Sequence, residues 1–444
     1  MKRYEAYKPT ETNWIPSVPI TWDMKKIVHL FSQRKEKVSD RDFPPLSVTK
    51  NGILPQLDNA AKTDDGDNRK RVCVGDFVIN SRSDRKGSCG VSTLEGSVSL
   101  INIVLQPRQQ LTGNYAHYLL RSQPFSEEFY RNGRGIVADL WTTRYSEMKT
   151  ILLPVPPREE QDQIVRYLDW QMSKINRLIA AKREKIALFE ELKTHQITDA
   201  VLHGVKQYKK YIKTQEFGRI PAHWQIYQNK RLFRERVEHS EMGTETLLSV
   251  SKHYGVKPSA DLTEDEQFAT IKPALSLAGY KVVHKNDLVM NIMRARNGSY
   301  GISAYNGIVS PAYCIYYVTK NCNVKYLHYF LRTPHVKSLF ETYSSGIAEH
   351  RRRLYPEDFL RLASILPPIG DQNEIVEYIE QSLVKYDEAI VNLKRQIACL
   401  QDMKTRLISD VVTGQVDVRG IKVPDDEYIN NEITEEEFEE TEEN

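Results

Sequence analysis

The sequence predicts an α/β (α+β) protein in which two similar mixed α/β globules are joined by two long helices that form an antiparallel coiled coil, with an internal pseudo-twofold repeat. Three observations lead to this fold class. The chain has 444 residues, more than one usual domain of roughly 100 to 200 residues. Its two halves match each other in order. Each half also contains more than 40 consecutive residues with neither Pro nor Gly.

The internal repeat is the strongest of these observations. The segment VPITW at 18–22 returns 202 residues later as IPAHW at 220–224. Between Val72 and Ser99 the offset is 211 without a gap, and 12 of these 28 positions are identical. Two half-chains of about 210 residues therefore share one architecture.

Each half divides again into a globule and a helix. Short β-type runs and Gly-rich turns indicate the globules, and a proline pair separates each globule from a long helix that ends near Gly204 or Gly414. The predicted parts are globule 1 at 1–155, spacer helix 1 at 156–204, globule 2 at 205–366, spacer helix 2 at 367–418 and a tail at 419–444. We expect the tail to be disordered, because residues 425–444 hold 11 acidic side chains and no Lys or Arg.

Apolar residues recur in steps of three and four along both helices, which is the spacing of a coiled-coil seam. In the first helix Lys182 interrupts this pattern. The predicted pairing residues are Leu168, Ile175, Ile179, Ile186 and Phe189 in the first helix, and Ile375, Ile379, Leu383, Ile390, Leu393, Ile397 and Leu400 in the second. The alternative is that each apolar stripe packs only on its own globule.

The formal net charge of +3 hides a basic body. Residues 1–424 hold all 62 Lys and Arg side chains but only 48 of the 59 acidic ones, which gives this part a net charge of +14. A basic body suits a polyanionic partner such as nucleic acid, although it also serves solubility.

Targeting and redox signals are those of a cytoplasmic protein. The first residues lack the apolar core of a secretory signal, and no stretch reaches the roughly 20 apolar residues that span a bilayer. The five cysteines lie far apart without a C-x-x-C pair, so neither a disulfide framework nor a zinc site is indicated. We expect no membrane contact and no bound metal.

Sequence signatures of catalysis are missing. The chain has no phosphate-binding G-x-x-x-x-G-K-[ST] loop, no G-x-G-x-x-G after a strand, no H-E-x-x-H and no G-x-S-x-G. The N/D-P-P-Y/F/W segment of amino-methyltransferases is also absent. We therefore interpret the chain as a binding protein with no catalytic residues.

Two clusters in each half are candidates for DNA binding, because loop arginines and amides beside small residues can reach phosphates and base edges. The candidate residues are Arg82, Arg85 and Lys86 with Trp141 and Arg144 in the first half, and Arg294, Arg296 and Asn297 with Arg351, Arg352 and Arg353 in the second. The alternative is that these are solvated loop charges. Packing explains Trp141 as well as base contact does.

Comparison of the two halves divides these candidates into residues expected to contact phosphates and residues expected to read bases. Positions needed for the fold or for phosphate contact should match, whereas positions that read different bases should differ. Arg85, which matches Arg296, is therefore the phosphate candidate. The differing positions are the base-reading candidates: Arg82/Met293, Asp84/Ala295, Lys86/Asn297 and the run 137–144 against 348–354.

Two diverged globules alternating with two similar long helices resemble the specificity subunit of Type I restriction-modification enzymes. The resemblance covers the chain up to about Val418. It rests on the arrangement: I/V-P-x-x-W opens each globule, P-P closes it, and QDQIV at 161–165 matches QNEIV at 372–376 as the helices begin.

The resemblance implies that the globules are target recognition domains 1 and 2, each reading one half of a split, asymmetric site in double-stranded DNA. It also implies that the helices set the spacing and dock two methyltransferase (modification) subunits and the restriction/translocase subunits. S-adenosylmethionine, ATP and Mg would bind those partners, and this chain would be a non-catalytic subunit of the DNA adenine methyltransferase and site-specific deoxyribonuclease complex. The acidic tail is not part of the family pattern.

Two other functions stay open at this point. A fused restriction-modification enzyme would need methyltransferase or nuclease motifs that the chain lacks. A coiled-coil scaffold with protein-binding globules would bind DNA weakly and without sequence preference.

Overall fold

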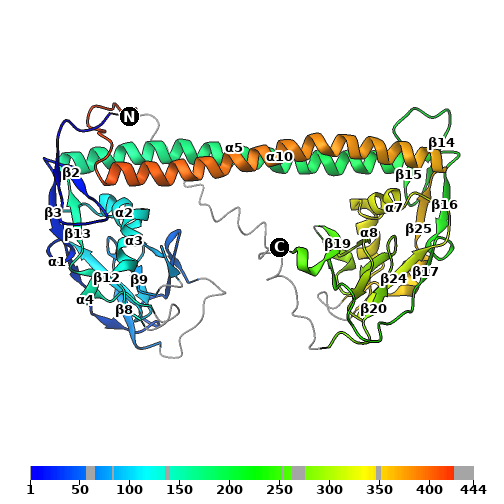
Figure 1. The fold of residues 1–444 in the computed structure, drawn as a ribbon, viewed down its shortest axis with the longest axis horizontal. Coiled ribbons are helices and arrows are strands. Elements are labelled where there is room, and N and C mark those ends of the chain that lie inside the picture. Colours follow the sequence, from blue (N-terminus) through cyan, green and yellow to red (C-terminus); the bar gives the residue numbers. More distant parts are fainter. Residues whose placement is uncertain are drawn as a thin grey trace. The chain divides into compact units, whose positions relative to one another are not determined.

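A computed structural model describes residues 2–56, 66–82, 85–135, 141–252, 254–262, 276–346 and 352–424. The chain divides into two compact units (Figure 1). Unit 1 comprises residues 1–183 and 394–444, and unit 2 comprises residues 184–393. Each unit contains one globule and a part of each long helix, so the units do not coincide with the five parts expected from the sequence.

The elements of globule 1 alternate short strands with a few helices. They are β1 (Tyr7–Pro9), β2 (Ser17–Pro19), β3 (Asp23–Lys26), α1 (Ile27–Leu30), β4 (Phe31–Gln33), β5 (Lys37–Val38), β6 (Leu46–Thr49), β7 (Gly52–Pro55), β8 (Arg69–Val72), β9 (Phe77–Asn80), β10 (Cys89–Val91), β11 (Gly96–Val98), β12 (Asn102–Pro107), α2 (Gly113–Arg121), α3 (Gln123–Arg131), α4 (Tyr145–Met148) and β13 (Leu152–Val155).

Globule 2 repeats this order. Its elements are β14 (Tyr211–Thr214), β15 (Gly218–Pro221), β16 (Gln225–Gln228), η3 (Asn229–Arg231), β17 (Phe233–Glu235), β18 (Leu248–Ser251), β19 (Gly255–Pro258), η4 (Ser259–Asp261), β20 (Lys281–Val283), β21 (Leu288–Asn291), η5 (Ala295–Asn297), β22 (Tyr300–Ile302), β23 (Gly307–Val309), β24 (Tyr313–Val318), α7 (Val324–Leu331), α8 (Pro334–Thr342), α9 (Pro356–Arg361) and β25 (Ala363–Leu366).

The main sheets of the two globules have the same topology, although β11, β8 and β5 form a three-stranded sheet in globule 1 where globule 2 pairs β20 with β23. A four-stranded antiparallel sheet runs β10-β9-β12-β4 in globule 1 and β22-β21-β24-β17 in globule 2. A second pairing joins β3 to β13 and β16 to β25, so the strand that precedes each long helix is tied to an early strand of its globule. The duplication predicted from the sequence is therefore a duplication of the fold.

The central strand of each sheet is covered on both faces, as its unbroken apolar run requires. Side chains of a strand point alternately to opposite faces. Phe77 and Ile79 of β9 belong to the main core of unit 1, whereas Val78 belongs to a smaller cluster on the other face. Leu288 and Val289 of β21 divide between two clusters of unit 2 in the same way.

The two long helices are α5 (Arg158–His203) and α10 (Ile369–Val412), which pack antiparallel within each unit (Figure 1). Residue numbers along α10 fall as those along α5 rise. The contacts that show this are, in unit 1, Asn176 with Lys404 (3.1 Å) and Lys182 with Gln396 (2.6 Å) and, in unit 2, the Phe189 ring with the Tyr386 ring (6.0 Å between centroids) and Gln196 with Tyr378 (2.8 Å). This confirms the predicted antiparallel coiled coil. Lys182, which interrupts the apolar pattern, donates a hydrogen bond to the partner helix.

The predicted pairing residues face inward to different degrees. The buried ones are Leu168, Ile175, Ile179, Ile375, Ile379, Ile390 and Leu393, and the half-buried ones are Ile186, Phe189, Leu383, Ile397 and Leu400. Near the start of α5, Leu168 shares one hydrophobic cluster with globule 1 and with Leu407 and Val411 of α10. The stripe therefore packs on its globule and on the other helix together.

The second long helix ends near Gly414, as predicted. α10 ends at Val412 and Gly414 follows with a φ of 76°, so the part assigned to spacer helix 2, 367–418, extends a few residues past the helix. The next residues are not helical, and three of their valines are buried in the core of unit 1: Val416, Val418 and Val423. A tail that begins at 419 is therefore placed too early, and the acidic residues 425–444 lie outside the described residues.

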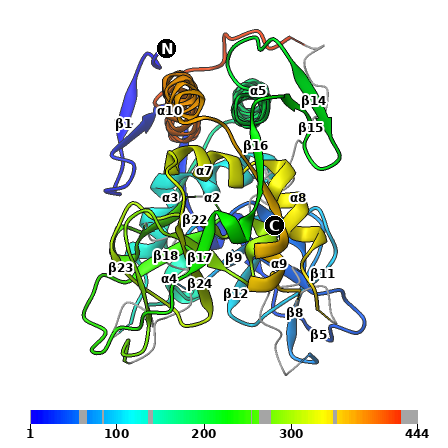
Figure 2. The same ribbon diagram turned by 90° about the vertical axis from the view of Figure 1, so that its right-hand side faces the viewer.

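A small hairpin packs beside one helix end in each unit, with β1 next to α10 and β14–β15 next to α5 (Figure 2). In unit 1 the Tyr7 hydroxyl donates to the carbonyl of Gly414 (3.0 Å). In unit 2 a Cβ on Gly204 would lie 2.5 Å from the Tyr208 ring, and its φ is 81°. Glycine is required at this helix end because the aromatic ring leaves no room for a side chain.

Candidate nucleic-acid interface

A buried ion pair supports the first candidate loop in each unit. Both guanidinium–carboxylate pairs are bidentate, Arg34 to Asp76 and Arg236 to Asp287, with N–O distances of 2.7 and 3.1 Å in each. Each aspartate, 2% exposed, also accepts the backbone N–H three residues before it. The hydrogen bonds to Asp76 raise the pKa of Arg34, against the effect of burial. The match between Asp76 and Asp287 is thus explained by the turn that leads into the central strand.

The loop after this strand is closed in the same way in both units. The Asn80 side-chain oxygen accepts the N–H of Arg82 (3.0 Å), and the Asn80 N–H donates to the carbonyl of Ser88 (3.0 Å). In unit 2, Asn291 makes the equivalent bonds. Gly87 and Gly298 adopt the left-handed region that these turns require, with φ of 81° and 90°. The loop charges between these anchors are therefore held at the surface.

The second candidate cluster lies next to the first candidate loop in each unit, and this contact was not predicted from the sequence. In unit 1, Arg82 forms a bridge with Thr142, and the N–H of Thr143 donates to the carbonyl of Ser81 (3.0 Å). In unit 2, the N–H of Leu354 donates to the carbonyl of Ile292 (3.0 Å). Each globule thus presents both candidate clusters on one surface.

Similar proteins share this architecture over almost the whole chain. No family model matches the sequence. The chain is 21% identical over 447 residues to the type I restriction enzyme MjaX specificity subunit of Methanocaldococcus jannaschii, covering 94% of this chain and 97% of the relative.

One solved structure shares the fold of this chain. A structure from work on complex assembly and conformational transition of the type I R-M system matches with a TM-score of 0.63 at 14% identity, covering 90% of this chain and 99% of that chain. The HsdS subunit from Thermoanaerobacter tengcongensis matches with a TM-score of 0.45 at 15% identity, covering 90% and 98% of the two chains. The chain is thus similar in sequence to a type I restriction enzyme specificity subunit and similar in fold to a chain from a type I R-M system.

The opening motif of each globule has a structural reason. The indole N–H of Trp22 donates to Glu160 (3.0 Å), and that of Trp224 donates to Asp371 (2.9 Å). Both carboxylates lie in the first turn of a long helix, where the helix dipole favours negative charge. Burial opposes ionisation, but hydrogen bonds from Trp224, Lys206 and His223 lower the pKa of Asp371. The motif therefore fastens each globule to the helix that follows it.

Exposure varies among the candidate DNA-binding residues of the first loop in each globule. Arg82, Arg85, Lys86, Arg294 and Asn297 are exposed, whereas Arg296 is half-buried. The Lys86 ammonium lies 2.6 Å from the Glu127 carboxylate in a surface ion pair, which is weak in water.

Trp141 and two arginines of the second cluster bind the protein itself. The indole N–H of Trp141 donates to the carbonyl of Tyr130 (2.8 Å), so its side chain is used in packing. The Arg352 guanidinium donates to the carbonyls of Glu341 and Ser344 at the end of α8. Arg353 is exposed and pairs through its backbone with Ser345, while Arg144 is exposed before α4. Arg351 lies outside the described residues, as does Asp84.

Two further pairs of residues that match between the halves lie near the first candidate loop. Arg121 and Arg332 each donate to the carbonyl of a hairpin turn, at Lys50 and Lys252 respectively. His117 and His328 lie one helical turn earlier, and burial together with the neighbouring arginine lowers the pKa of each histidine to about 4. The sequence repeat shows that both pairs match at the same offset between the halves. It does not show that the arginines contact a hairpin.

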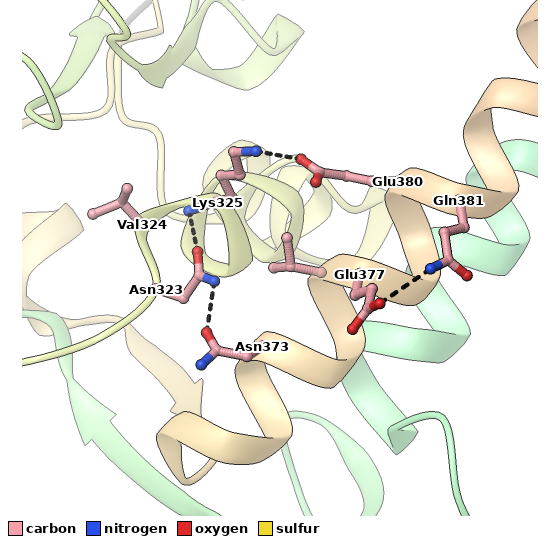
Figure 3. A pocket seen from close by; sticks show the side chains of 8 residues that line it. Asn323, Val324, Lys325, Asn373, Glu377, Glu380 and Gln381 are labelled. Carbon is pink, nitrogen blue, oxygen red and sulfur yellow. Dashed lines mark hydrogen bonds and ion pairs between the residues drawn. The ribbon is translucent and has the colours of Figure 1, made fainter.

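The outer side of α10 carries an open groove of about 460 Å³ in unit 2 (Figure 3). Its sides come from the start of α7 and from α10, which are joined by the Lys325–Glu380 ion pair (2.6 Å) and by a hydrogen bond that the Asn323 side-chain amide donates to the Asn373 side-chain oxygen (2.9 Å). Among the described residues no group of His, Cys, Asp or Glu could hold a metal ion, and no helix could cross a membrane.

Proposed function

We propose that this specificity subunit reads a bipartite, asymmetric site in double-stranded DNA, with one half-site for each globule. The observation that carries this proposal is the shared surface of the two candidate clusters. The same residues hold this surface in place in both units: the Arg–Asp ion pair, the asparagine that hydrogen-bonds across the loop and the glycine with a positive φ. The side chains displayed on that surface differ, which is what two unlike half-sites require.

The proposal assigns two roles on that surface. Arg85 and Arg296 hold phosphates, since they match between the halves. Arg82, Arg353 and Asn297 contact bases, since their partners in the repeat differ and all three are exposed. Arg352 and Trp141 contribute less to base reading than the sequence suggested, because their donor groups already bond to backbone carbonyls.

The outer faces of α5 and α10 dock the other subunits. Exposed apolar side chains on these helices support this: Leu188 and Leu192 of α5, and Val384 and Val391 of α10, in unit 2. Exposed apolar patches that are rimmed by polar groups are typical of protein interfaces. We propose two methyltransferase subunits and the restriction/translocase subunits as partners, with S-adenosylmethionine, ATP and Mg bound to them and not to this chain. The complex acts in the cytoplasm.

Binding measured as a function of salt tests this function. The purified chain, with and without co-expressed methyltransferase subunits, is titrated with random DNA and with DNA carrying the site methylated in cells that contain the system. Specific binding should be tighter by a factor of roughly 10³ or more. Equal, weak binding to both DNAs would instead favour a protein-binding scaffold, and methylation by the chain alone would favour a fused enzyme.

A further inference from the structure

A β-hairpin lies directly against the candidate loop in each unit. In unit 1 it is β6–β7, and a Cβ on Gly90, just after the loop, would lie 3.2 Å from Cα of Gly52 in this hairpin. In unit 2 it is β18–β19, and a Cβ on Gly301 would lie 3.2 Å from Cα of Gly255 in this hairpin. This close backbone contact favours glycine at 90 and 301, and Gly52 and Gly255 have positive φ angles of 128° and 78°, which favour glycine on the hairpin side. The hairpin therefore packs closely against the strand that follows the loop.

An arginine at the C-terminal end of α2 in unit 1, and of α7 in unit 2, donates a hydrogen bond to the turn of each hairpin. Arg121, the last residue of α2, donates to the carbonyl of Lys50. Arg332, the residue after α7, donates to the carbonyl of Lys252 and also to the carbonyl of Tyr300 (2.8 Å), which follows the loop. The arginine therefore fixes the hairpin turn relative to the loop.

The supports of the hairpin match between the units, but the turns do not. Thr49 pairs with Gly52, which leaves a two-residue turn of Lys50 and Asn51. In unit 2, Ser251 pairs with Gly255, which leaves three residues in the turn. Lys50 and Asn51 are both exposed, and the Asn51 N–H is fixed by the Thr49 hydroxyl (3.1 Å).

We propose that this hairpin turn is a second DNA-contacting element in each globule. Lys50 and the matching Lys252 contact phosphate, and Asn51, which has no match, reads a base of the half-site of globule 1. An exposed asparagine amide can bond to an adenine edge through two hydrogen bonds. Arg121 and Arg332 are positioning residues for these turns. The inference rests on the proposed function, because it extends the same DNA-reading surface.

Substitution at the turn tests this inference with the chain in complex with its methyltransferase subunits. N51A should lose discrimination at one base pair of one half-site by a factor of roughly 5 to 150 and leave the other half-site unchanged. K50A should weaken binding to cognate and random DNA alike and lower the salt slope by about one. The matched control is N114A, an exposed asparagine at the opposite end of α2, which should change neither quantity.

A double-mutant cycle tests the positioning residue. R121A should reproduce the loss seen in N51A at the same base pair, and R121A/N51A should lose little more, because both changes remove one contact. A merely structural role for Arg121 would instead give additive losses that affect both half-sites and lower the melting temperature.

The outcomes separate the two proposals. If the wild-type complex discriminates its site and N51A keeps full discrimination at every position, the hairpin inference is wrong and the proposed function stands. If the wild-type complex shows no sequence preference at all, both fail.

Discussion

Acidification should destabilise both globules through one half-buried histidine in each. His117 and His328 have a pKa near 4 in the folded chain, against 6.5 for a free histidine. The folded state therefore binds fewer protons than the unfolded state between these pH values, so stability falls as the pH decreases from 6.5 towards 4. A shift of 2.5 units corresponds to about 3 kcal/mol in full, of which about 2 kcal/mol per histidine is lost between pH 7 and pH 4.5.

Urea unfolding at the two pH values measures this loss. The variant H117Q/H328Q removes both titrating rings, so its unfolding free energy should fall less on acidification than that of the wild type, by about 4 kcal/mol in total if the two units unfold together. H29Q replaces an exposed histidine of α1 and should keep the wild-type response. Carboxylates such as Asp371 also weaken the fold in acid, but they do so equally in all three proteins. An identical pH response of the wild type and the double variant would refute the reasoning.

Three further predictions concern the proposed complex. Replacing Arg85 or Arg296 by Ala should weaken binding to all DNA sequences and lower the salt slope by about one, whereas R353A should relax selectivity in one half-site by about 1 to 3 kcal/mol; equal losses on cognate and random DNA for a well-folded R353A would make Arg353 a phosphate contact. Deleting one heptad from each long helix should change the gap in the recognised site but neither half-site, as methylome sequencing would show; an unchanged gap would contradict a spacing role. Native mass spectrometry of the co-expressed complex should show two methyltransferase subunits per chain, and a stable one-to-one complex would contradict this.

The duplication predicted more of the fold than any local pattern. Positions that match at a constant offset, such as Asp76 with Asp287, fix shared turns, and from these the two globules and the order of their elements follow. The Pro-free and Gly-free stretches predicted α5 and α10 because a long helix excludes both residues from its interior. Gly414 predicted the end of α10, but the segment after it was not predictable, because the burial of Val416 and Val418 in the core of unit 1 depends on tertiary packing.

The candidate site was only partly predictable, because side-chain donors choose partners that are distant in sequence. Nothing near Arg352 shows that its guanidinium bonds to the end of α8, eight or more residues earlier. Likewise, the separation of 71 residues between Arg121 and Lys50 conceals their contact. Spacing predicts which charges lie in loops, and tertiary packing then decides which of them still have donors available for DNA.

The repeat also separates the residues that build the surface from those displayed on it. Arg121 and Arg332 sit at matching positions and hold backbone carbonyls, so their contacts do not depend on the side chains of the turns. The turn can therefore change in length, from two residues after Thr49 to three after Ser251, without moving its support. A fold that fixes its recognition elements through backbone contacts allows the displayed residues to diverge between the globules. Two unlike half-sites can then be read by one duplicated architecture.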